Sequence, residues 1–301
     1  MNETINDISQ NNRWMQTEHR MKHNAKSSEH YLPRAAYLRH FSDTADPDDR
    51  KNVLSVFNVQ TKSVRNSTVY REGYENKLYE GAGLAVNKVE DFLAEIEKDF
   101  VAEISRLIAI CSSSANNNAL ILHGKDKKDN LRFFLTLQHF RTPKTRDEYD
   151  CDERDRQEIF LGGIVGKNEN GKWWIKHNAD KLINHYFVFE RNETGIPFAI
   201  ADQPVLIFKS AEEEQALNFR FPLSSWLQVL VIDPNSSEHK KHYQYRNRLR
   251  IIPSGYEQVI HVWNQRAIEN AKRFVFFDPR FQLDQSSDSK TPILAYNKPQ
   301  R

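Results

Sequence analysis

The order of apolar and polar positions in the first half of the chain is typical of helices. Along residues 84–111, apolar side chains recur every three or four positions opposite acids and lysines, and this spacing predicts one long amphipathic helix. A second helix is expected at residues 129–141, where Pro143 ends it. A closing helix is expected at residues 255–273. The mixed-charge run at residues 146–158 is interpreted as a solvated loop.

The period changes to that of strands in the second half. Short apolar runs bounded by Pro, Asp and Gly predict strands at residues 173–175, 186–190, 197–201, 205–208, 218–221 and 227–232. Because helices come first and strands later, the expected fold class is α+β, with long helices of the N-terminal half packed on a mixed or antiparallel sheet formed mainly by the C-terminal half. We expect one domain at residues 29–281, a flexible leader at 1–28 and a polar tail at 282–301.

Composition narrows the classes of protein. With 43 Lys and Arg against 41 Asp and Glu, the formal net charge is +2, which excludes a wholly basic nucleic-acid coat and leaves only local basic patches. The two cysteines, Cys111 and Cys151, are too few for a disulfide framework or a structural zinc site. No apolar run approaches the ~20 residues of a membrane span, and the first residues hold no apolar signal segment. We therefore expect a cytoplasmic protein with no membrane partner.

Two polar residues interrupt the apolar face of the helix predicted at residues 129–141. Gln138 and Arg141 follow the stripe that should face the core, three positions apart. A buried guanidinium is very costly without partners. Arg141 is therefore expected either to hold an anionic ligand or to pair with a carboxylate such as Glu80, Glu90 or Asp202.

Two further residues are candidates by their position. His30 precedes the helix start predicted at Pro33, where backbone N–H groups favour an anion or a general acid. Asp202 follows an apolar strand, and sites often gather at strand ends. The sequence Asp202-Gln203-Pro204 is equally typical of a turn, and a lone His is often structural.

A loose ribonuclease-like spacing occurs on the same predicted helix. Arg132 and His139 are seven positions apart, which resembles the Arg-x(4–6)-His motif of metal-independent HEPN-type ribonucleases. In that chemistry the two side chains act on the ribose 2′-hydroxyl and the scissile phosphate. Any charged helix can match the spacing by chance, so two solvent-facing residues are the alternative.

A basic stretch from residue 240 to 250 alternates basic and apolar side chains with the period of a strand. Its arginines could follow a phosphate backbone while its tyrosines stack on bases. The alternative is an edge strand that its charges protect from aggregation. The candidate nucleic-acid-binding residues are Lys240, Lys241, Tyr243, Tyr245, Arg246, Arg248 and Arg250.

Sequence motifs for cofactors are absent from the chain. It contains no HExxH, CxxC, Walker, GxGxxG or GxSxG pattern, so no nucleotide cofactor is indicated. A divalent ion such as Mg²⁺ or Mn²⁺ stays compatible with the sequence, with Asp202 as a candidate ligand.

Blocks in sequence order nevertheless resemble a known family. They comprise Glu29–Arg34 with Tyr37–Phe41, Leu137–Arg146, Phe198–Val205, Pro222–Ser224, and Asn264 with Ala271–Val275. They resemble the patterns His-Tyr-(Val/Ile)-Pro-x-x-Tyr-Leu-x-x-Phe, Gln-x-x-Arg-Thr-Pro-x-x-Arg, Phe-Ile-Thr-Ser-Asp-Asn-Pro-Val and Pro-Leu-Ser, and the closing helix, of the bacterial domain-of-unknown-function family 4238. The resemblance spans about residues 29–277. Ala201 and Gln203 depart from the Ser and Asn usual beside the Asp.

The resemblance implies a set of site residues but no established activity. Some family members lie near mobile or defence-type loci, which is only an association. If the polar residues in motif positions converge, they would form a pocket with one carboxylate. These residues are His30, Gln138, Arg141, Arg146, Asp202, Asn264 and Arg273.

Two functions are consistent with such a pocket. In a nuclease or phosphodiesterase, arginines would hold the phosphate, His30 would be general acid or base, Asp202 would orient it or bind a metal, and Gln138 would position water. Arg146, Asn264 and Arg273 would then bind the ligand. The alternative is a non-catalytic module that binds RNA, DNA or a small ligand around a structural polar core.

Overall fold

The computed structural model describes residues 29–31, 35–44, 46, 48, 50–72, 74–76, 78–79, 88–209, 216–284 and 293–296. The leader predicted at residues 1–28 lies outside the described residues. In the segment predicted as a polar tail, residues 282–284 belong to a strand that pairs with residues 293–296.

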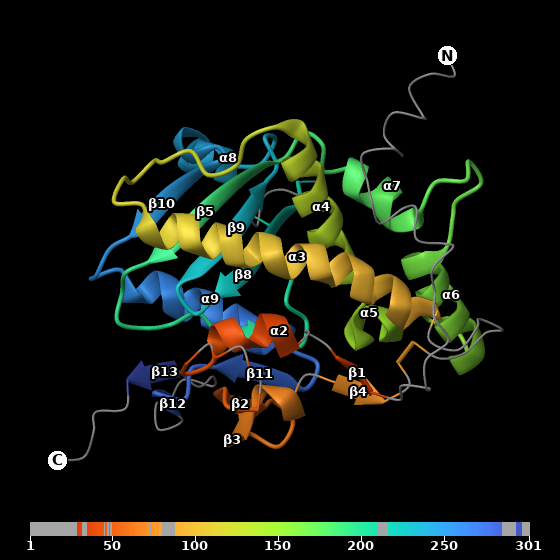
Figure 1. Ribbon diagram of the computed structural model, residues 1–301, viewed down its shortest axis with the longest axis horizontal. Helices are drawn as coiled ribbons and strands as arrows, with labels where there is room; N and C mark the ends of the chain where they lie inside the picture. Colours follow the sequence, from red (N-terminus) through yellow and green to blue (C-terminus); the bar gives the residue numbers. More distant parts are fainter. Residues whose placement is uncertain are drawn as a thin grey trace.

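The helices lie mostly in the N-terminal half of the chain and just beyond it, in agreement with the prediction. They are α2 (Ala35–Leu38), α3 (Lys88–Ser113), α4 (Lys125–Phe140), α5 (Pro143–Asp147), α6 (Glu153–Val165) and α7 (Trp174–Asp180), followed late in the chain by α8 (Glu238–His242) and α9 (Glu257–Asn270). The long helix α3 crosses one face of the main sheet (Figure 1).

The main sheet has five strands, and four of them come from the C-terminal third of the chain. Its order is β10 (Arg248–Ile252), β5 (Tyr186–Asn192), β9 (Leu227–Ile232), β8 (Asn218–Ser224) and β7 (Leu206–Phe208). All neighbours are antiparallel except β10 and β5, which are parallel. The sheet is therefore mixed, and the predicted α+β class is confirmed.

A second, antiparallel sheet combines strands from both ends of the chain. Its order is β3 (Ser63–Thr68), β2 (Val53–Asn58), β11 (Phe274–Phe277) and β6 (Ile200–Ala201). Two strand pairs lie beside it: β1 (Glu29–Tyr31) with β4 (Tyr74–Asn76), and β12 (Phe281–Asp284) with β13 (Ile293–Tyr296).

The alternation of side chains along each strand divides the core into layers. Phe187 and Phe189 of β5 belong to the large cluster that packs under α3 and α4, whereas Tyr186 and Val188 face the other way, toward Trp263 of α9. Helix α9 lies between the two sheets. It packs on one sheet near its start and on the other near its end.

Between residues 146 and 175, two of the predicted elements are wrong. Residues 146–158, predicted as a solvated loop, contain the end of α5 and the start of α6. A charged run can form a helix when it has a cap, and Asp152 accepts a hydrogen bond of 2.9 Å from the Asp155 N–H at the start of α6. Residues 173–175, predicted as a strand, instead lead into α7. Three residues are too few for the period to separate strand from helix.

Candidate functional site

Arg141 is buried in an ion pair. Its guanidinium donates to Glu97 of α3, and the two side chains are 2% and 7% exposed. Burial alone would lower the pKa of Arg141, but the negative field of Glu97, with lesser contributions from neighbours, raises it above its usual value. The Tyr79 hydroxyl also donates 3.2 Å to the Arg141 carbonyl. A carboxylate partner was one of the two expectations, and Glu97 is such a partner. Of the acids named from the sequence, Glu90 also acts to raise the pKa of Arg141, and Glu80 lies outside the described residues.

Asp202 joins two strands of the second sheet. Its carboxylate accepts hydrogen bonds from the backbone N–H groups of Lys272 (2.9 Å), Arg273 (2.7 Å) and Phe274 (3.0 Å). Its own N–H donates 2.9 Å to the Phe274 carbonyl. Burial raises the pKa of Asp202, and the amide hydrogen bonds partly offset this rise. The carboxylate therefore fixes the start of β11 beside β6.

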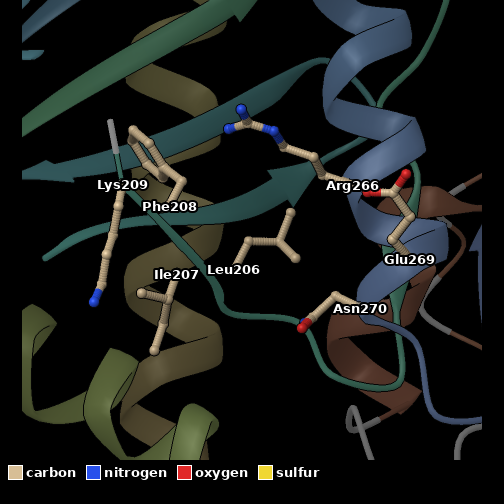
Figure 2. Close-up of a pocket in the computed structure, with 7 residues that line it drawn as sticks. All are labelled: Leu206, Ile207, Phe208, Lys209, Arg266, Glu269 and Asn270. Carbon is tan, nitrogen blue, oxygen red and sulfur yellow. The ribbon is translucent and has the colours of Figure 1, made fainter. Parts of the chain in front are cut away.

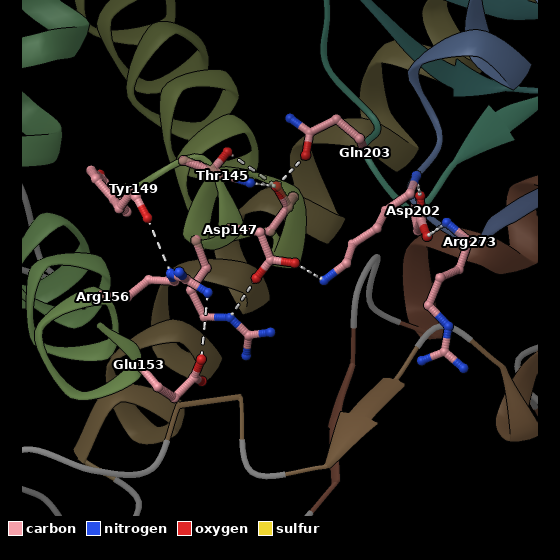
Figure 3. A network of polar contacts seen from close by, with 11 residues as sticks. Thr145, Asp147, Tyr149, Glu153, Arg156, Asp202, Gln203 and Arg273 are labelled. Carbon is pink, nitrogen blue, oxygen red and sulfur yellow. Dashed lines mark hydrogen bonds and ion pairs between the residues drawn. The ribbon is translucent and has the colours of Figure 1, made fainter. Parts of the chain in front are cut away.

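Gln203 connects the junction of β6 and β11 to the turn between α4 and α5. The Thr142 hydroxyl donates to its Oε1, and its Nε2 lies 3.2 Å from Nδ1 of His139. On the other side, the Gln203 carbonyl accepts a hydrogen bond of 3.3 Å from Nδ2 of Asn270. Figure 3 shows Gln203 beside Thr145 of α5. The hydroxyl groups of Thr142 and Thr145 also interact with each other.

Two lysines complete the contacts. Nζ of Lys144 donates to Oδ1 of Asn270 at 2.7 Å. Lys272 forms an ion pair with Asp147, whose other oxygen lies 3.1 Å from Nε of Arg146. Burial opposes ionisation of Asp147, but these two cations hold its pKa below the usual value. The blocks 137–146, 198–205 and 264–275, which resembled a family in sequence, are therefore in direct contact. We call this set of contacts the motif network. Its residues are His139, Thr142, Lys144, Arg146, Asp147, Asp202, Gln203, Asn270, Lys272 and Arg273.

His139 is the titratable imidazole of the motif network. Burial, together with the positive charge of Lys144, lowers its pKa to about 4. The imidazole is thus neutral near pH 7. Arg132, the second residue of the ribonuclease-like spacing, binds groups outside the motif network. It pairs with Asp129 at 2.7 Å and donates a hydrogen bond of 3.0 Å to the His185 carbonyl.

The remaining polar motif residues do not form one pocket around Asp202. The side chain of Asn264 bonds the backbone at Ala199 and Pro197, both at 2.8 Å. Arg273 is exposed, and its guanidinium points away from Asp202 (Figure 3). Gln138 is buried one turn before Arg141. The backbone of His30 belongs to β1, not to a helix start, and its side chain lies outside the described part of the chain. The catalytic and ligand-binding roles given to these residues stay predictions.

The basic stretch from residue 240 to 250 is not one strand, as its alternation predicted. Residues 240–242 end α8, a 3₁₀ turn follows at Tyr243–Tyr245, and only β10 is extended. Arg250 pairs with the buried Glu190 at 2.7 Å, and Arg248 donates 2.9 Å to the Asn118 carbonyl. Backbone hydrogen bonds from residues 118–122 also cover this edge of β10.

The outer part of the stretch is open to solvent. Tyr245 is half-buried and lies 5.9 Å from the Arg250 guanidinium. The exposed residues of the stretch are Lys240, Lys241, Tyr243, Gln244 and Arg246. The arginines of the predicted basic face therefore differ: Arg248 and Arg250 bind other groups of the protein, whereas Arg246 is exposed to solvent.

A cleft of about 320 Å³ lies between β7 and α9. Figure 2 shows Arg266 reaching from α9 across the cleft toward Phe208. The Arg266 guanidinium lies 5.2 Å from the ring centre of Trp263. The cleft has an apolar floor and two cations against one carboxylate. Its lining residues are Leu206, Ile207, Phe208, Lys209, Arg266, Glu269 and Asn270.

Asn270 belongs both to the cleft wall and to the motif network, because its side chain contacts Lys144 and Gln203. Sequence reasoning missed the cleft residues Lys209, Arg266 and Asn270. The four-residue spacing of Arg266 and Asn270 places them on one face of α9, but no sequence signal showed that this face meets β7.

The described residues lack the features of two other classes of site. They hold no group of three or more His, Cys, Asp and Glu side chains placed to bind a metal ion. They also hold no helix with the length and apolar character needed to cross a bilayer.

Fold and site together define an α+β protein in which a polar network supports a ligand-sized cleft. Residues 29–281 match the model of the family described as "Protein of unknown function (DUF4238)", and the chain belongs to this family. The match confirms the resemblance seen in the sequence. Comparisons with curated proteins and with solved structures find no match.

Proposed function

We propose that the protein binds a small anionic ligand, of phosphate-bearing nucleotide class, in the cleft between β7 and α9. The observation that carries the proposal is Arg266, an exposed guanidinium held over the Trp263 ring at the mouth of a cleft. This is the second of the two functions expected from the sequence, a ligand-binding module around a structural polar core.

The dimensions and lining of the cleft support a nucleotide-sized ligand. About 320 Å³ is at the lower end of the ~300–1,000 Å³ that small-molecule sites occupy. Leu206 and Phe208 offer an apolar floor for a ring, and Arg266 with Lys209 supplies positive charge. A guanidinium suits phosphate because its N–H groups match two oxygens at once.

The motif network supports the proposal by fixing the far wall. Asn270 is held by Lys144 on one side and by the Gln203 carbonyl on the other. A wall fixed in this way loses little conformational freedom when a ligand binds. The same network accounts for polar residues in motif positions without requiring that each touch the ligand.

Phosphodiester hydrolysis, the reaction expected from the sequence, is the second candidate. His139 is the imidazole that bears on it: it is neutral near pH 7, the form that a general base needs, and its pKa of about 4 makes it a weak base. His139 is linked to the cleft through Gln203 and Asn270. The test is incubation with RNA, DNA and nucleotides, with and without Mg²⁺ or Mn²⁺. Intact substrates in every mixture reject a nuclease or phosphodiesterase, and with it the suggested defence role.

A cytoplasmic location is proposed together with this function. Cys111 and Cys151 are both free thiols, the state that a reducing compartment maintains. Because Cys111 is buried, the test is thiol labelling after the protein is taken directly from cells and denatured. Labelling of both cysteines would support this location, and blocked or oxidised cysteines would contradict it.

Ligand-induced thermal stabilisation tests the proposed binding. A ligand that binds only the folded state at a concentration of 100 Kd stabilises it by about 2.7 kcal/mol. Inorganic phosphate, nucleoside mono- and diphosphates and a 5′-phosphorylated oligoribonucleotide are compared, so that free nucleotide and nucleic-acid end are distinguished. We expect a nucleotide to raise the melting temperature of the wild type and to raise that of Arg266→Ala much less. No rise with any of these anions would reject the proposal.

A further inference from the structure

A second guanidinium is buried close to the cleft with most of its hydrogen-bonding capacity unused. Arg220 of β8 is 0% exposed. Its Nε donates to Oε1 of Gln228 at 2.5 Å. Its two terminal nitrogens, Nη1 and Nη2, have no hydrogen-bond partner among the described residues. Four N–H donors at the end of this side chain are therefore buried and unsatisfied.

Glu190, a carboxylate whose charge acts on Arg220, is already paired with another arginine. Gln228 donates 2.7 Å to one oxygen of Glu190, and Arg250 donates 2.7 Å to the other oxygen. Burial lowers the pKa of Arg220 to about 9, although Tyr37 and Glu190 act to raise it. Arg220 is therefore still charged near pH 7, and no carboxylate of the described residues pairs with it directly.

Aromatic rings replace the missing partner only in part. The Arg220 guanidinium lies 5.1 Å from the ring centre of Phe198 and 5.3 Å from that of Trp263. A desolvated cation–π contact contributes on the order of 2 kcal/mol, whereas a buried ion without its counter-ion costs several kcal/mol. A side chain retained at such a cost is typical of a functional position.

One of the two aromatic neighbours of Arg220, Trp263, contacts residues that line the cleft. Trp263 contacts Arg220 and, at 5.2 Å, the cleft guanidinium of Arg266. The ring of Phe208, which lines the cleft, packs edge-on against Trp263 at 5.1 Å. Leu206, another lining residue, is the direct partner of Arg220 in the pairing of β7 with β8. Trp263 thus contacts both Arg220 and two residues that line the cleft, Phe208 and Arg266.

We propose that the cleft continues inward to Arg220, whose terminal nitrogens bind a second anionic group of the ligand when the Trp263 side chain turns aside. This inference rests on the proposed function, because the first anionic group is the one held by Arg266. The inference restricts the ligand to compounds with two anionic groups, such as a nucleoside diphosphate. The Trp263 side chain would separate the binding positions of the two groups until it moves.

Calorimetric titration of wild type, Arg220→Met and Arg266→Ala with a nucleoside diphosphate and with inorganic phosphate tests the proposal. Arg220→Met is expected to weaken diphosphate binding at least tenfold, which corresponds to about 1.4 kcal/mol. It should not lower the melting temperature markedly, because it removes an uncompensated charge. Arg141→Met is the matched buried control, and it should lower the melting temperature strongly because Glu97 loses its partner.

Trp263 gives a second measurement on the unmodified protein. Diphosphate should change the tryptophan fluorescence of the wild type, and Trp263→Phe should abolish the change. Binding that is weakened by Arg266→Ala but unchanged in Arg220→Met would overturn the inner site alone. So would failure of Arg220→Met to fold, or a ligand that binds without any fluorescence change. No binding to the wild type would overturn the proposed function as well.

Discussion

Arg141, which directly follows α4, and Glu97 of α3 form a buried ion pair that joins the two helices covering one face of the main sheet. Removing one partner of such a pair leaves the other charge buried and uncompensated, which costs about 3–5 kcal/mol. We therefore expect Arg141→Ala to lower the free energy of unfolding by that amount, measured by urea denaturation. Arg141→Met combined with Glu97→Leu should lose much less.

The control for this prediction is Arg154→Ala. The Arg154 side chain is 86% exposed and pairs with Glu158 at 3.3 Å on the surface of α6, so its loss should change stability by no more than about 0.5 kcal/mol. If Arg141→Ala is as stable as this control, the ion pair is not structural, and the catalytic role predicted for Arg141 regains support.

Asp202 gives a second stability prediction. Replacement by Ala leaves three backbone N–H groups without their carboxylate partner, and each buried unsatisfied donor costs about 1–3 kcal/mol. Asp202→Ala should therefore shift the denaturation midpoint well below that of the wild type. A variant with full stability that has lost a metal-dependent activity would show instead that Asp202 is a metal ligand.

The pKa of His139 predicts a pH dependence of stability. Its pKa is about 4 in the folded protein against 6.5 for an ordinary histidine, so the unfolded chain binds more protons between these values. Stability should fall as the pH drops from 6.5 toward 4, by at most about 1.4 kcal/mol per pH unit from this group. Denaturation across this range should show a shallower fall for His139→Asn. Parallel curves for the two proteins would contradict the assignment.

The basic stretch yields a comparison between two arginines. Arg250 compensates the buried Glu190, whereas Arg246 is exposed and lies over the Tyr186 ring at 5.7 Å. Arg250→Ala should destabilise the fold by a few kcal/mol, while Arg246→Ala should have little effect on stability. Polyanion binding that falls equally in both variants, with both fully stable, would favour the nucleic-acid surface expected from the sequence.

The sequence predicted the main helices and most strands because long amphipathic periods report which face is buried. It placed Arg141 in the core for the same reason, but it could not name Glu97. The two residues are 44 positions apart, and periodicity says nothing of what opposes a buried face. The alternation from Tyr243 to Ile251 suggested one long strand, yet only the part that pairs with β5 is extended.

The cleft could not be predicted for a related reason. Nothing in the sequence distinguishes Lys209 and Arg266 from other charged residues, and both line one cleft only because α9 packs beside β7. Arg220 carried a sequence signal, a charged residue between Phe219 and Phe221 in an apolar strand. Such a residue is usually assigned to a solvent-facing position, and in this protein both faces of the sheet are covered.

Calorimetric titration of the wild type, Arg266→Ala and Arg154→Ala with one nucleotide tests the binding proposal most directly. Loss of a charge-assisted contact of about 1.5–3 kcal/mol should weaken binding to Arg266→Ala by roughly ten- to hundredfold, and Arg154→Ala should bind as the wild type does. Equal affinity in all three proteins would contradict the assignment of the ligand to the cleft between β7 and α9.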